Sequence, residues 1–234
     1  MTVPPALDPS PVRAIVFDLD GTLVDSYRPI TTSVNHARAR FGMLPLGLAE
    51  IRSRVGRGLE HLIGELVGPD HVEQGVQLFR QCYSEIYADQ TVGLPGVVKT
   101  LRGLREAGYS MAVASNKPAR FSRPILQRVG MLPFIDCVQG PDLVASAKPE
   151  PAMILRCLEL LDVTRSEAVY VGDMLLDVES AARAGLPVIL VPGGSSEPEQ
   201  LRGTGQPLLS SFEALLELLP GPPAGPRHRL PQSV

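Results

Sequence analysis

Side chains that can do chemistry follow directly after short apolar runs in this sequence. Asp18 and Asp20 come after the run at 12–17. Three later runs lead to a hydroxyl and an amide, to an ammonium group, and to two further carboxylates: Ser115 and Asn116, Lys148, and Asp173 and Asp177. Two carboxylates as close as Asp18 and Asp20, joined by a third, repel each other unless a cation lies among them. Hard oxygen ligands of this kind suit Mg²⁺, which proteins bind through one or two carboxylates together with waters and phosphate.

A single Asp after a strand more often forms a turn or caps the next helix than binds a ligand. Here four polar segments occur in order along one chain: DLDGT, SNK, KP and GDMLLD. Turns or helix caps alone do not explain why all four segments carry polar or ionisable side chains. Gly21 adds to the argument, because a glycine lets the backbone turn tightly and approach a ligand closely.

The elements that must position these residues follow an alternating pattern. Short apolar runs typical of buried strands occur at 12–17, 110–115, 134–138, 168–172 and 187–191, and helical periodicity occurs at 96–107, 118–130, 149–161, 175–184 and about 210–219. Apolar strands that alternate with helices predict an α/β fold, a Rossmann-like parallel sheet flanked by helices. Ligands bind at the carboxyl ends of the strands in such sheets, which is where the polar segments fall.

The alternation is interrupted after the first strand. Residues 26–89 contain no strand-like run, and their periodicity predicts helices at 27–41, 48–55, 58–67 and 70–88. We therefore expect an all-helical cap domain at 26–89 inserted into an α/β core domain made of 12–25 and 90–219. Prolines at both ends of the chain predict a disordered N-terminal arm at 1–11 and a disordered Pro-rich tail at 220–234.

The composition excludes several classes of protein. The chain has 234 residues, 44% of them hydrophobic, and a net charge of −3, so no basic excess favours nucleic acid as a partner. No apolar stretch reaches the roughly 20 residues of a membrane span, and no signal peptide is recognisable. Three widely spaced cysteines, Cys82, Cys137 and Cys157, fit the core of a cytoplasmic protein. The missing GxxxxGK[ST] and GxSxG motifs exclude a P-loop kinase and a serine hydrolase of the nucleophile-elbow type.

The four segments together resemble the motifs of the haloacid dehalogenase superfamily, whose phosphohydrolases use an aspartate as the nucleophile. DLDGTL at 18–23 matches the first motif, Ser115 with Asn116 the second, Lys148 the third, and Gly172-Asp173 with Asp177 the fourth. The predicted helical insertion after DGTLVDS is similar to the helical cap of this family. Within the family, the stretches DLDGTLVDS, VGRGL and VGD…D…AARAG resemble phosphoglycolate phosphatases.

The resemblance implies a Mg²⁺-dependent phosphomonoesterase acting on a small phosphorylated metabolite, with 2-phosphoglycolate as the leading substrate. Asp18 would form an aspartyl-phosphate, and Asp20 would serve as general acid and then general base. The metal ligands would be Asp18, Asp20 through its backbone carbonyl, and Asp173. The transferring phosphoryl group would be held by Lys148 and Ser115 and by amides near Asn116 and Gly21.

Three further residues near the motifs are open to more than one interpretation. Asp177 would anchor the water shell of the metal or pair with Lys148. Thr22 would bond a neighbouring carboxylate or cap the following helix. Lys117 is able to reach the substrate phosphate, but a surface lysine at the start of a helix is the favoured interpretation.

The cap is expected to select the substrate. Arg57 stands between two glycines and could meet a substrate carboxylate, as glycolate requires, although a solvated basic face formed with Arg52 and Arg54 is the alternative. His61 is expected at the surface. The same chemistry on pyrophosphate, a nucleotide or a sugar phosphate, a phosphosugar mutase reaction, and a non-catalytic binding protein remain alternative functions. A monomer or a homodimer is expected.

Overall fold

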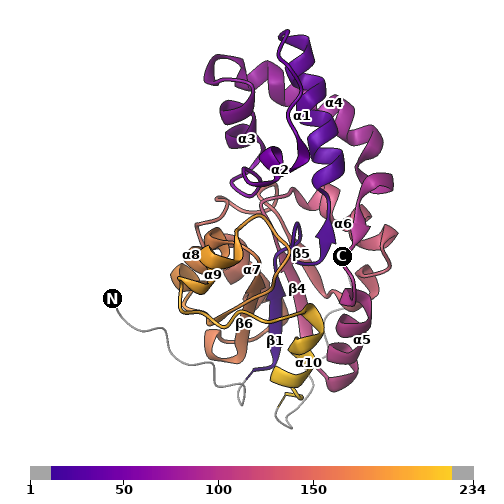
Figure 1. The fold of residues 1–234 in the computed structure, drawn as a ribbon. Helices are drawn as coiled ribbons and strands as arrows, with labels where there is room; N and C mark the ends of the chain where they lie inside the picture. The colour runs from indigo at the N-terminus through magenta and orange to yellow at the C-terminus, as the bar shows by residue number, and fades with distance from the viewer. Residues whose placement is uncertain (1–11, 223–234) are drawn as a thin grey trace.

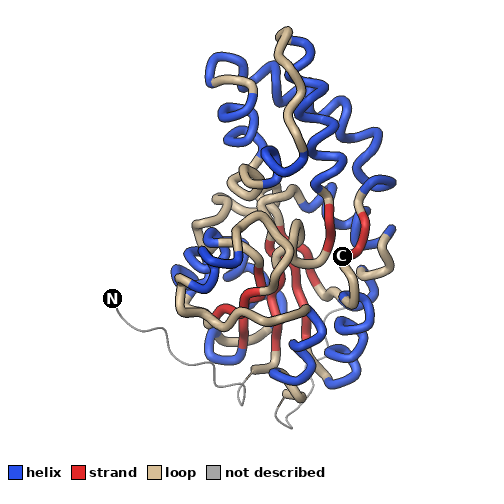
Figure 2. Tube along the Cα trace, viewed as in Figure 1, coloured by secondary structure: helices blue, strands red, loops and turns tan. Residues whose placement is uncertain are grey.

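A five-stranded parallel sheet forms the centre of the molecule (Figure 1, Figure 2). The computed structural model describes residues 12–222, so the predicted arm at 1–11 and residues 223–234 of the predicted tail lie outside the described residues. The strand order is β5-β4-β1-β6-β7, which are Cys137–Gln139, Ser110–Ala114, Ala14–Phe17, Ala168–Gly172 and Val188–Leu190. Every neighbouring pair in this sheet is parallel, as the alternating sequence pattern predicts.

Helices cover both faces of this sheet. One face packs against α5, α6 and α10, which are Val97–Ala107, Ala119–Arg128 and Leu215–Leu218. The other face packs against α7, α8 and α9, which are Ala152–Leu161, Leu175–Ala184 and Pro198–Arg202. Side chains alternate along β1, so Ile15 and Phe17 belong to the first cluster and Ala14 and Val16 to the second. Both sets are fully buried, which explains why the run reads as continuously apolar.

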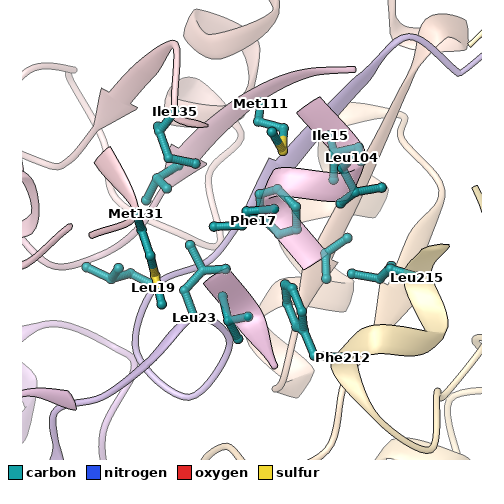
Figure 3. Close-up of a cluster of buried hydrophobic side chains, with 14 of the residues drawn as sticks. Ile15, Phe17, Leu19, Leu23, Leu104, Met111, Met131, Ile135, Phe212 and Leu215 are labelled. Atoms are coloured by element: carbon teal, nitrogen blue, oxygen red, sulfur yellow. The ribbon is translucent and has the colours of Figure 1, made fainter. Parts of the chain in front are cut away.

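Phe17 anchors the larger hydrophobic cluster. Figure 3 shows it among Met111, Leu104 and Phe212, with the rings of Phe17 and Phe212 5.9 Å apart. Removing a buried ring of this size costs about 3–5 kcal/mol in other proteins. This packing fixes the end of β1, and with it the position of Asp18.

Several predicted elements are shorter than expected. β1 begins at Ala14 rather than at residue 12, and α7 begins at Ala152 rather than 149 because prolines occupy 149 and 151. The strand expected at 134–138 is Cys137–Gln139. There the side chain of Asp136 accepts a hydrogen bond from the backbone N–H of Met111, just before the ladder begins. Short 3₁₀ helices occupy Pro69–His71, Leu132–Phe134, Arg165–Glu167 and Phe212–Ala214, the last in place of the start of the helix expected at 210–219.

Two small features were not predicted. β2 (Val24–Asp25) pairs antiparallel with β3 (Val92–Gly93), and α9 follows the last strand. Two residues are too few to show the alternation that identifies a strand. The β2–β3 pair lies where the chain leaves the core and returns, so it fixes the base of the helical region.

The helical region between β1 and β4, here called the cap, consists of α1, α2, α3 and α4. These helices are Tyr27–Arg40, Leu48–Arg52, Leu59–Leu66 and Val72–Gln90, close to the predicted ranges. The cap lies beyond one end of the sheet in Figure 1 and has a hydrophobic cluster of its own, centred on α1, α3 and α4. The domain boundaries given above remain predictions.

The cysteines and the helix lengths bear on the compositional arguments. All three cysteines are free. Cys137 and Cys157 are buried as expected, whereas Cys82 is only half-buried on α4, so its assignment to the core was wrong. Within residues 12–222, none of the helices combines the length and the apolar character that crossing a bilayer requires.

Candidate active site

Three buried carboxylates meet at the carboxyl end of the sheet. Asp18 follows β1, Asp173 follows β6, and Asp177 lies in the first turn of α8. Each offers an oxygen within 4.8 Å of the others. The convergence follows from topology, because β1 and β6 are neighbours in the sheet and end at the same edge. Asp20, predicted as a ligand through its backbone carbonyl, has its side chain outside this group.

Lys148 is the cation inside this cluster. Its Nζ lies 2.8 Å from Asp18 Oδ1 and 2.8 Å from Asp177 Oδ1, and it donates to the Tyr170 hydroxyl at 3.0 Å. Burial acts to lower the pKa of Lys148, but Asp177 and Asp18 outweigh it and raise that pKa well above its ordinary value. Of the two roles considered for Asp177, the structure therefore places it in an ion pair with Lys148.

Asp173 is held in place from both sides. Thr22 donates from Oγ1 to Asp173 Oδ1 at 2.7 Å, and the backbone N–H of Ser195 donates to Oδ2 at 3.0 Å. Thr22 therefore bonds a neighbouring carboxylate, which was one of the two interpretations of its role. The loop after β7 approaches so closely that a Cβ on Gly194 would lie 1.6 Å from Asp173 Oδ2, so only glycine fits there.

The cluster carries more negative charge than Lys148 can balance. Burial, and then the neighbouring Asp177 and Asp18, raise the pKa of Asp173 well above its usual range. Burial also raises the pKa of Asp177 to about 6, although Lys148 opposes the shift. Asp18 Oδ1 is buried and pairs with Lys148. Among the described residues, it accepts no hydrogen bond. A small divalent cation would offset this repulsion, so the residues present fit a metal ion with hard oxygen ligands.

Asp20 lies beside the cluster in a network that reaches the cap. Ser26 donates to Asp20 Oδ1, and the Nζ of Lys117 lies 3.0 Å from Asp20 Oδ2. Lys117 also donates to the hydroxyl of Tyr83, on α4, at 2.7 Å. The interpretation of Lys117 as a surface lysine was therefore wrong, because this residue is buried. Burial acts to lower the pKa of Lys117, but Asp20 and Tyr83 raise it overall.

The start of α6 explains why Lys117 points inward. The carboxylate of Asp142 accepts hydrogen bonds from the backbone N–H groups of Ala119, at 2.7 Å, and Arg120, at 3.3 Å. The helix therefore begins after Pro118, and Lys117 still belongs to the loop at the edge of the sheet. The cap then closes over the lysine from the other side.

Asn116 connects three parts of the site through its side chain. Its amide group donates to the carbonyl oxygens of Gly56 at 2.8 Å and Lys148 at 3.1 Å, and accepts from the N–H of Lys148 at 2.7 Å. The side chain is thus engaged within the protein, which leaves the predicted phosphoryl contact to a backbone amide. Ser115 is buried at the end of β4 and lines the same cavity as Asp18.

Gly21 makes the tight turn that the sequence predicts. Its φ is +88°, and a Cβ there would lie 2.5 Å from the Tyr27 hydroxyl and 2.7 Å from Asp173 Oδ2. Its own N–H donates to the carbonyl of Val24 at 2.8 Å and is therefore engaged within the turn. Among the described residues, no hydrogen bond is found for the N–H groups of Leu19 and Asp20, which leaves these two amides for a phosphoryl group.

A cavity of about 360 Å³ opens above Asp18 and Asp20. Core residues form its floor, including Ser115, Lys117 and Lys148, and the cap forms much of its wall. The cavity is therefore lined both by core residues predicted to bind phosphate and by the cap segment predicted to select the substrate.

The cap residues predicted as a basic cluster lie in different environments. Arg57 is exposed and lines the cavity, and Arg54 is exposed. Arg52 instead reaches the core, where its Nε donates to the carbonyl of Gly194 at 2.9 Å. His61 lies at the surface of α3 as expected, 3.4 Å from Glu65.

Four residues at the site were missed by sequence reasoning: Tyr27, Tyr83, Tyr170 and Ser195. The rule that places polar residues after the strands also predicts Ser195, since the strand at 187–191 is followed by PGGSS. The three tyrosines carry no such signal, because each occurs within an apolar helix or strand pattern that equally predicts core.

The family model described as haloacid dehalogenase-like hydrolase matches residues 15–191. The match runs from β1 to the end of the last strand, so it includes the carboxylates, Ser115 and Lys148. The chain belongs to this family. As a haloacid dehalogenase-like hydrolase, it is an enzyme, and its fold is that of the haloacid dehalogenase superfamily.

Curated proteins named phosphoglycolate phosphatase are similar to this hydrolase. The protein of Pseudomonas putida is 34% identical over 218 residues, which cover 89% of this chain and 79% of that protein. The protein of Rhodobacter capsulatus is 35% identical over 187 residues, covering 77% and 84% of the two chains. The hydrolase is therefore a phosphatase of the haloacid dehalogenase type, and it resembles phosphoglycolate phosphatases.

Solved structures agree on the architecture of the hydrolase. A putative phosphoglycolate phosphatase from Lactobacillus delbrueckii superposes with a TM-score of 0.82 at 24% identity, covering 89% of this chain and 98% of that one. A putative haloacid dehalogenase-like hydrolase from Bacteroides fragilis gives 0.80 at 26% identity, with 87% and 99% covered. The core and the cap of the haloacid dehalogenase fold are thus both present.

Proposed function

We propose that this phosphatase hydrolyses 2-phosphoglycolate with Mg²⁺ as its cofactor and an aspartyl-phosphate on Asp18 as its intermediate. The observation that carries the proposal is the position of Asp18, in contact with Lys148 and within 4.8 Å of Asp173 and Asp177 through their oxygens. A nucleophile in a phosphoryl transfer needs cations beside it, because the phosphoryl oxygens are themselves negative.

Asp18 would act as the nucleophile. Its carboxylate oxygen attacks phosphorus, the bond from phosphorus to the alcohol oxygen breaks, and an acyl-phosphate forms. Lys148 stabilises the negative charge of the phosphoryl oxygens. Ser115 and the free amides of Leu19 and Asp20 supply further donors to the same group. These donors are fixed before the reaction, so they need little reorganisation.

Asp20 would handle the protons. In the first half of the reaction it protonates the departing alcohol oxygen, and in the second it takes a proton from the water that attacks phosphorus. Phosphate then leaves and the Asp18 carboxylate is restored. The contacts of Asp20 with Ser26 and Lys117 hold this side chain toward the cavity rather than toward the buried cluster.

Asp18, the backbone carbonyl of Asp20, and Asp173 would hold the Mg²⁺. When bound, the ion supplies positive charge that neutralises the phosphoryl oxygens and lowers the barrier to attack. Thr22 and the N–H of Ser195 fix the orientation of Asp173. Asp177 holds Lys148 in position through its ion pair.

Phosphoglycolate is proposed as the substrate because the curated relatives carry that name and because Arg57 lines the cavity. Its guanidinium would pair with the glycolate carboxylate. A monomer or homodimer in the cytoplasm, without nucleic-acid or membrane partners, is proposed with it.

The test is a comparison of wild-type protein with Asp18→Asn on 2-phosphoglycolate in Mg²⁺. We expect the variant to lose at least about 10³-fold in kcat/KM while keeping its circular dichroism spectrum, because an amide does not form the acyl-phosphate. Rapid denaturation of the wild type during turnover should trap phosphate on Asp18, to be located by mass spectrometry. A loss of only a few-fold would rule out Asp18 as the nucleophile.

A further inference from the structure

The cavity above Asp18 has more room, and a more apolar wall, than a glycolate group needs. Its volume is about 360 Å³, within the range of roughly 300–1,000 Å³ of pockets that enclose drug-sized ligands. Phosphoglycolate carries only a two-carbon acid on its phosphate. Part of the cavity would therefore stay unfilled by the substrate proposed above.

Three aromatic rings form one side of this cavity. Phe79 and Tyr83, both on α4, stack with ring centroids 5.1 Å apart, and Phe121 on α6 meets Tyr83 edge-on at 5.5 Å. The Tyr83 hydroxyl accepts a hydrogen bond from Lys117, which pairs with Asp20. This aromatic wall, formed by Phe79, Tyr83 and Phe121, thus begins beside the group proposed to protonate the leaving oxygen.

Aliphatic side chains continue this surface into the cap. Ile30 on α1 and Leu62 on α3 line the same cavity and are otherwise buried in the hydrophobic cluster of the cap. Water against such side chains and rings finds few hydrogen-bond partners, so an apolar group that displaces it binds favourably. The part of the substrate attached to the leaving oxygen therefore faces an apolar wall.

One cation in the cavity remains available for an anion on the substrate. Arg80 pairs with Glu60 at 3.2 Å and Arg120 with Asp142 at 3.8 Å. For the side chain of Arg57, by contrast, no ion pair or hydrogen bond is found within residues 12–222. Arg57 is thus the arginine of this cavity best placed to bind a carboxylate.

We propose that the site takes 2-phospho carboxylic acids whose second carbon bears an apolar, aromatic side chain. The carboxylate pairs with Arg57, and the side chain lies against the aromatic wall. 2-Phosphoglycolate has the same 2-phospho carboxylate but lacks the side chain. This inference rests on the proposed phosphomonoesterase function, since it concerns the leaving group of that same reaction.

Five substrates separate the two parts of the inference: ethyl phosphate, 2-phosphoglycolate, 2-phenylethyl phosphate, and the two enantiomers of 2-phospho-3-phenyllactate. The set adds a carboxylate and a phenyl group singly and together, while the phosphate stays on an aliphatic alcohol oxygen. We expect kcat/KM to be at least about ten-fold higher for one phenyllactate enantiomer than for phosphoglycolate. The carboxylate should add a similar factor over the two neutral alcohols.

Variants then assign the two effects to residues. Phe79→Leu keeps the cavity apolar but removes one ring, so we expect the ratio of kcat/KM for phosphophenyllactate over phosphoglycolate to fall at least about three-fold. Arg57→Met should lower the preference for carboxylate substrates instead. Val76→Ala is the matched control, because Val76 is buried on the same helix and does not line the cavity. A ratio taken within one protein does not depend on how much of it is folded.

The outcomes are distinguishable from a failure of the proposed function. If none of the five substrates is hydrolysed in Mg²⁺, the phosphomonoesterase assignment fails. If phosphoglycolate is hydrolysed as fast as or faster than both phenyllactate enantiomers, the apolar side chain is wrong and the proposed function stands. Equal rates for 2-phenylethyl phosphate and phosphophenyllactate would overturn the role of Arg57.

Discussion

The guanidinium of Arg52, at the end of α2 in the cap, donates from Nε to the carbonyl oxygen of Gly194 in the core at 2.9 Å. Its Nη2 donates to the same oxygen at 2.6 Å, and the group lies 4.9 Å from the centroid of the Tyr27 ring. The next residue, Ser195, donates its N–H to Asp173. One short loop therefore connects the position of the cap to a carboxylate of the candidate metal site.

The variant Arg52→Ala should weaken both the cap contact and the metal site. Without the guanidinium, the loop that carries Gly194 and Ser195 loses its contact with the cap, and Asp173 loses part of its support. We expect the Mg²⁺ concentration for half-maximal activity to rise several-fold and kcat/KM to fall about ten-fold, within the range seen when groups that orient metal ligands are removed. Mg²⁺ titrations followed by activity and by calorimetry measure both effects.

Arg54→Ala is the matched control for this prediction. Arg54 is exposed on the same segment, so its removal changes the net charge equally. Arg52→Lys should restore little, because a lysine does not reproduce the fork of donors that Arg52 directs at this loop. If Arg52→Ala and Arg54→Ala give the same Mg²⁺ dependence and the same kcat/KM, the contact between Arg52 and this loop does not affect the metal site.

The sequence was sufficient to predict the framework of the site. Each strand that carries a site residue is a short apolar run, and α8 spans Leu175–Ala184 as predicted. The sequence predicts that Asp18 and Asp173 lie close together, because parallel strands end at the same edge of a sheet. The strand positions and the rule of parallel topology are sufficient for this prediction.

Contacts between cap and core could not be predicted in this way. Arg52 and Gly194 are separated by 142 residues, and nothing in either local pattern specifies the angle at which the cap meets the core. Lys117 was assigned to the surface because it stands at the start of a predicted helix, and lysine is mostly exposed in proteins. Its partners, Asp20 and Tyr83, come from two other segments that only the folded chain brings together.

Removal of divalent metal should abolish activity and lower thermal stability. Asp18, Asp173 and Asp177 together repel one another, and burial makes that repulsion strong. Mg²⁺ should restore turnover after EDTA treatment and raise the melting temperature, since a ligand that binds only the folded state stabilises it. Ca²⁺ should raise the melting temperature without restoring turnover, because it takes more ligands at longer distances.

Differential scanning fluorimetry and phosphate release assays check this prediction in parallel. Asp173→Asn serves as the control, because it removes one charge of the cluster and should reduce the Mg²⁺-dependent rise in melting temperature. Full activity in excess EDTA would contradict the assignment of the carboxylates to a metal site.

Lys117→Met should reduce activity without removing any group from the phosphoryl pocket. The lysine neutralises Asp20 and fixes its carboxylate, so without it the general acid loses its orientation. We expect kcat to fall about 10²-fold, in the range that general acid–base catalysis contributes. Lys99→Met, at an exposed position on α5, is the control and should leave kcat unchanged. Equal kcat values for the two variants would show that Asp20 does not depend on Lys117.

Lys148→Arg should be nearly as damaging as Lys148→Ala. The lysine side chain is 1% exposed, and its Nζ contacts Asp18, Asp177 and Tyr170 within 3.0 Å. A planar guanidinium is wider than an ammonium group and has no room to reproduce all three contacts. Losing a charge contact that forms mainly in the transition state costs about 3 kcal/mol, or roughly 10²-fold in rate.

The measurement for Lys148 is kcat/KM of both variants in saturating Mg²⁺, below the melting temperature of each. Removing one partner of a buried ion pair costs about 3–5 kcal/mol of stability, so Lys148→Ala requires circular dichroism as proof of folding. Lys99→Arg is the control for the exchange itself, since that residue is exposed. If Lys148→Arg keeps more than about a third of the wild-type kcat/KM, a loss below about 1 kcal/mol, any positive charge suffices at this position. The three contacts of Lys148 would then have no special role in catalysis.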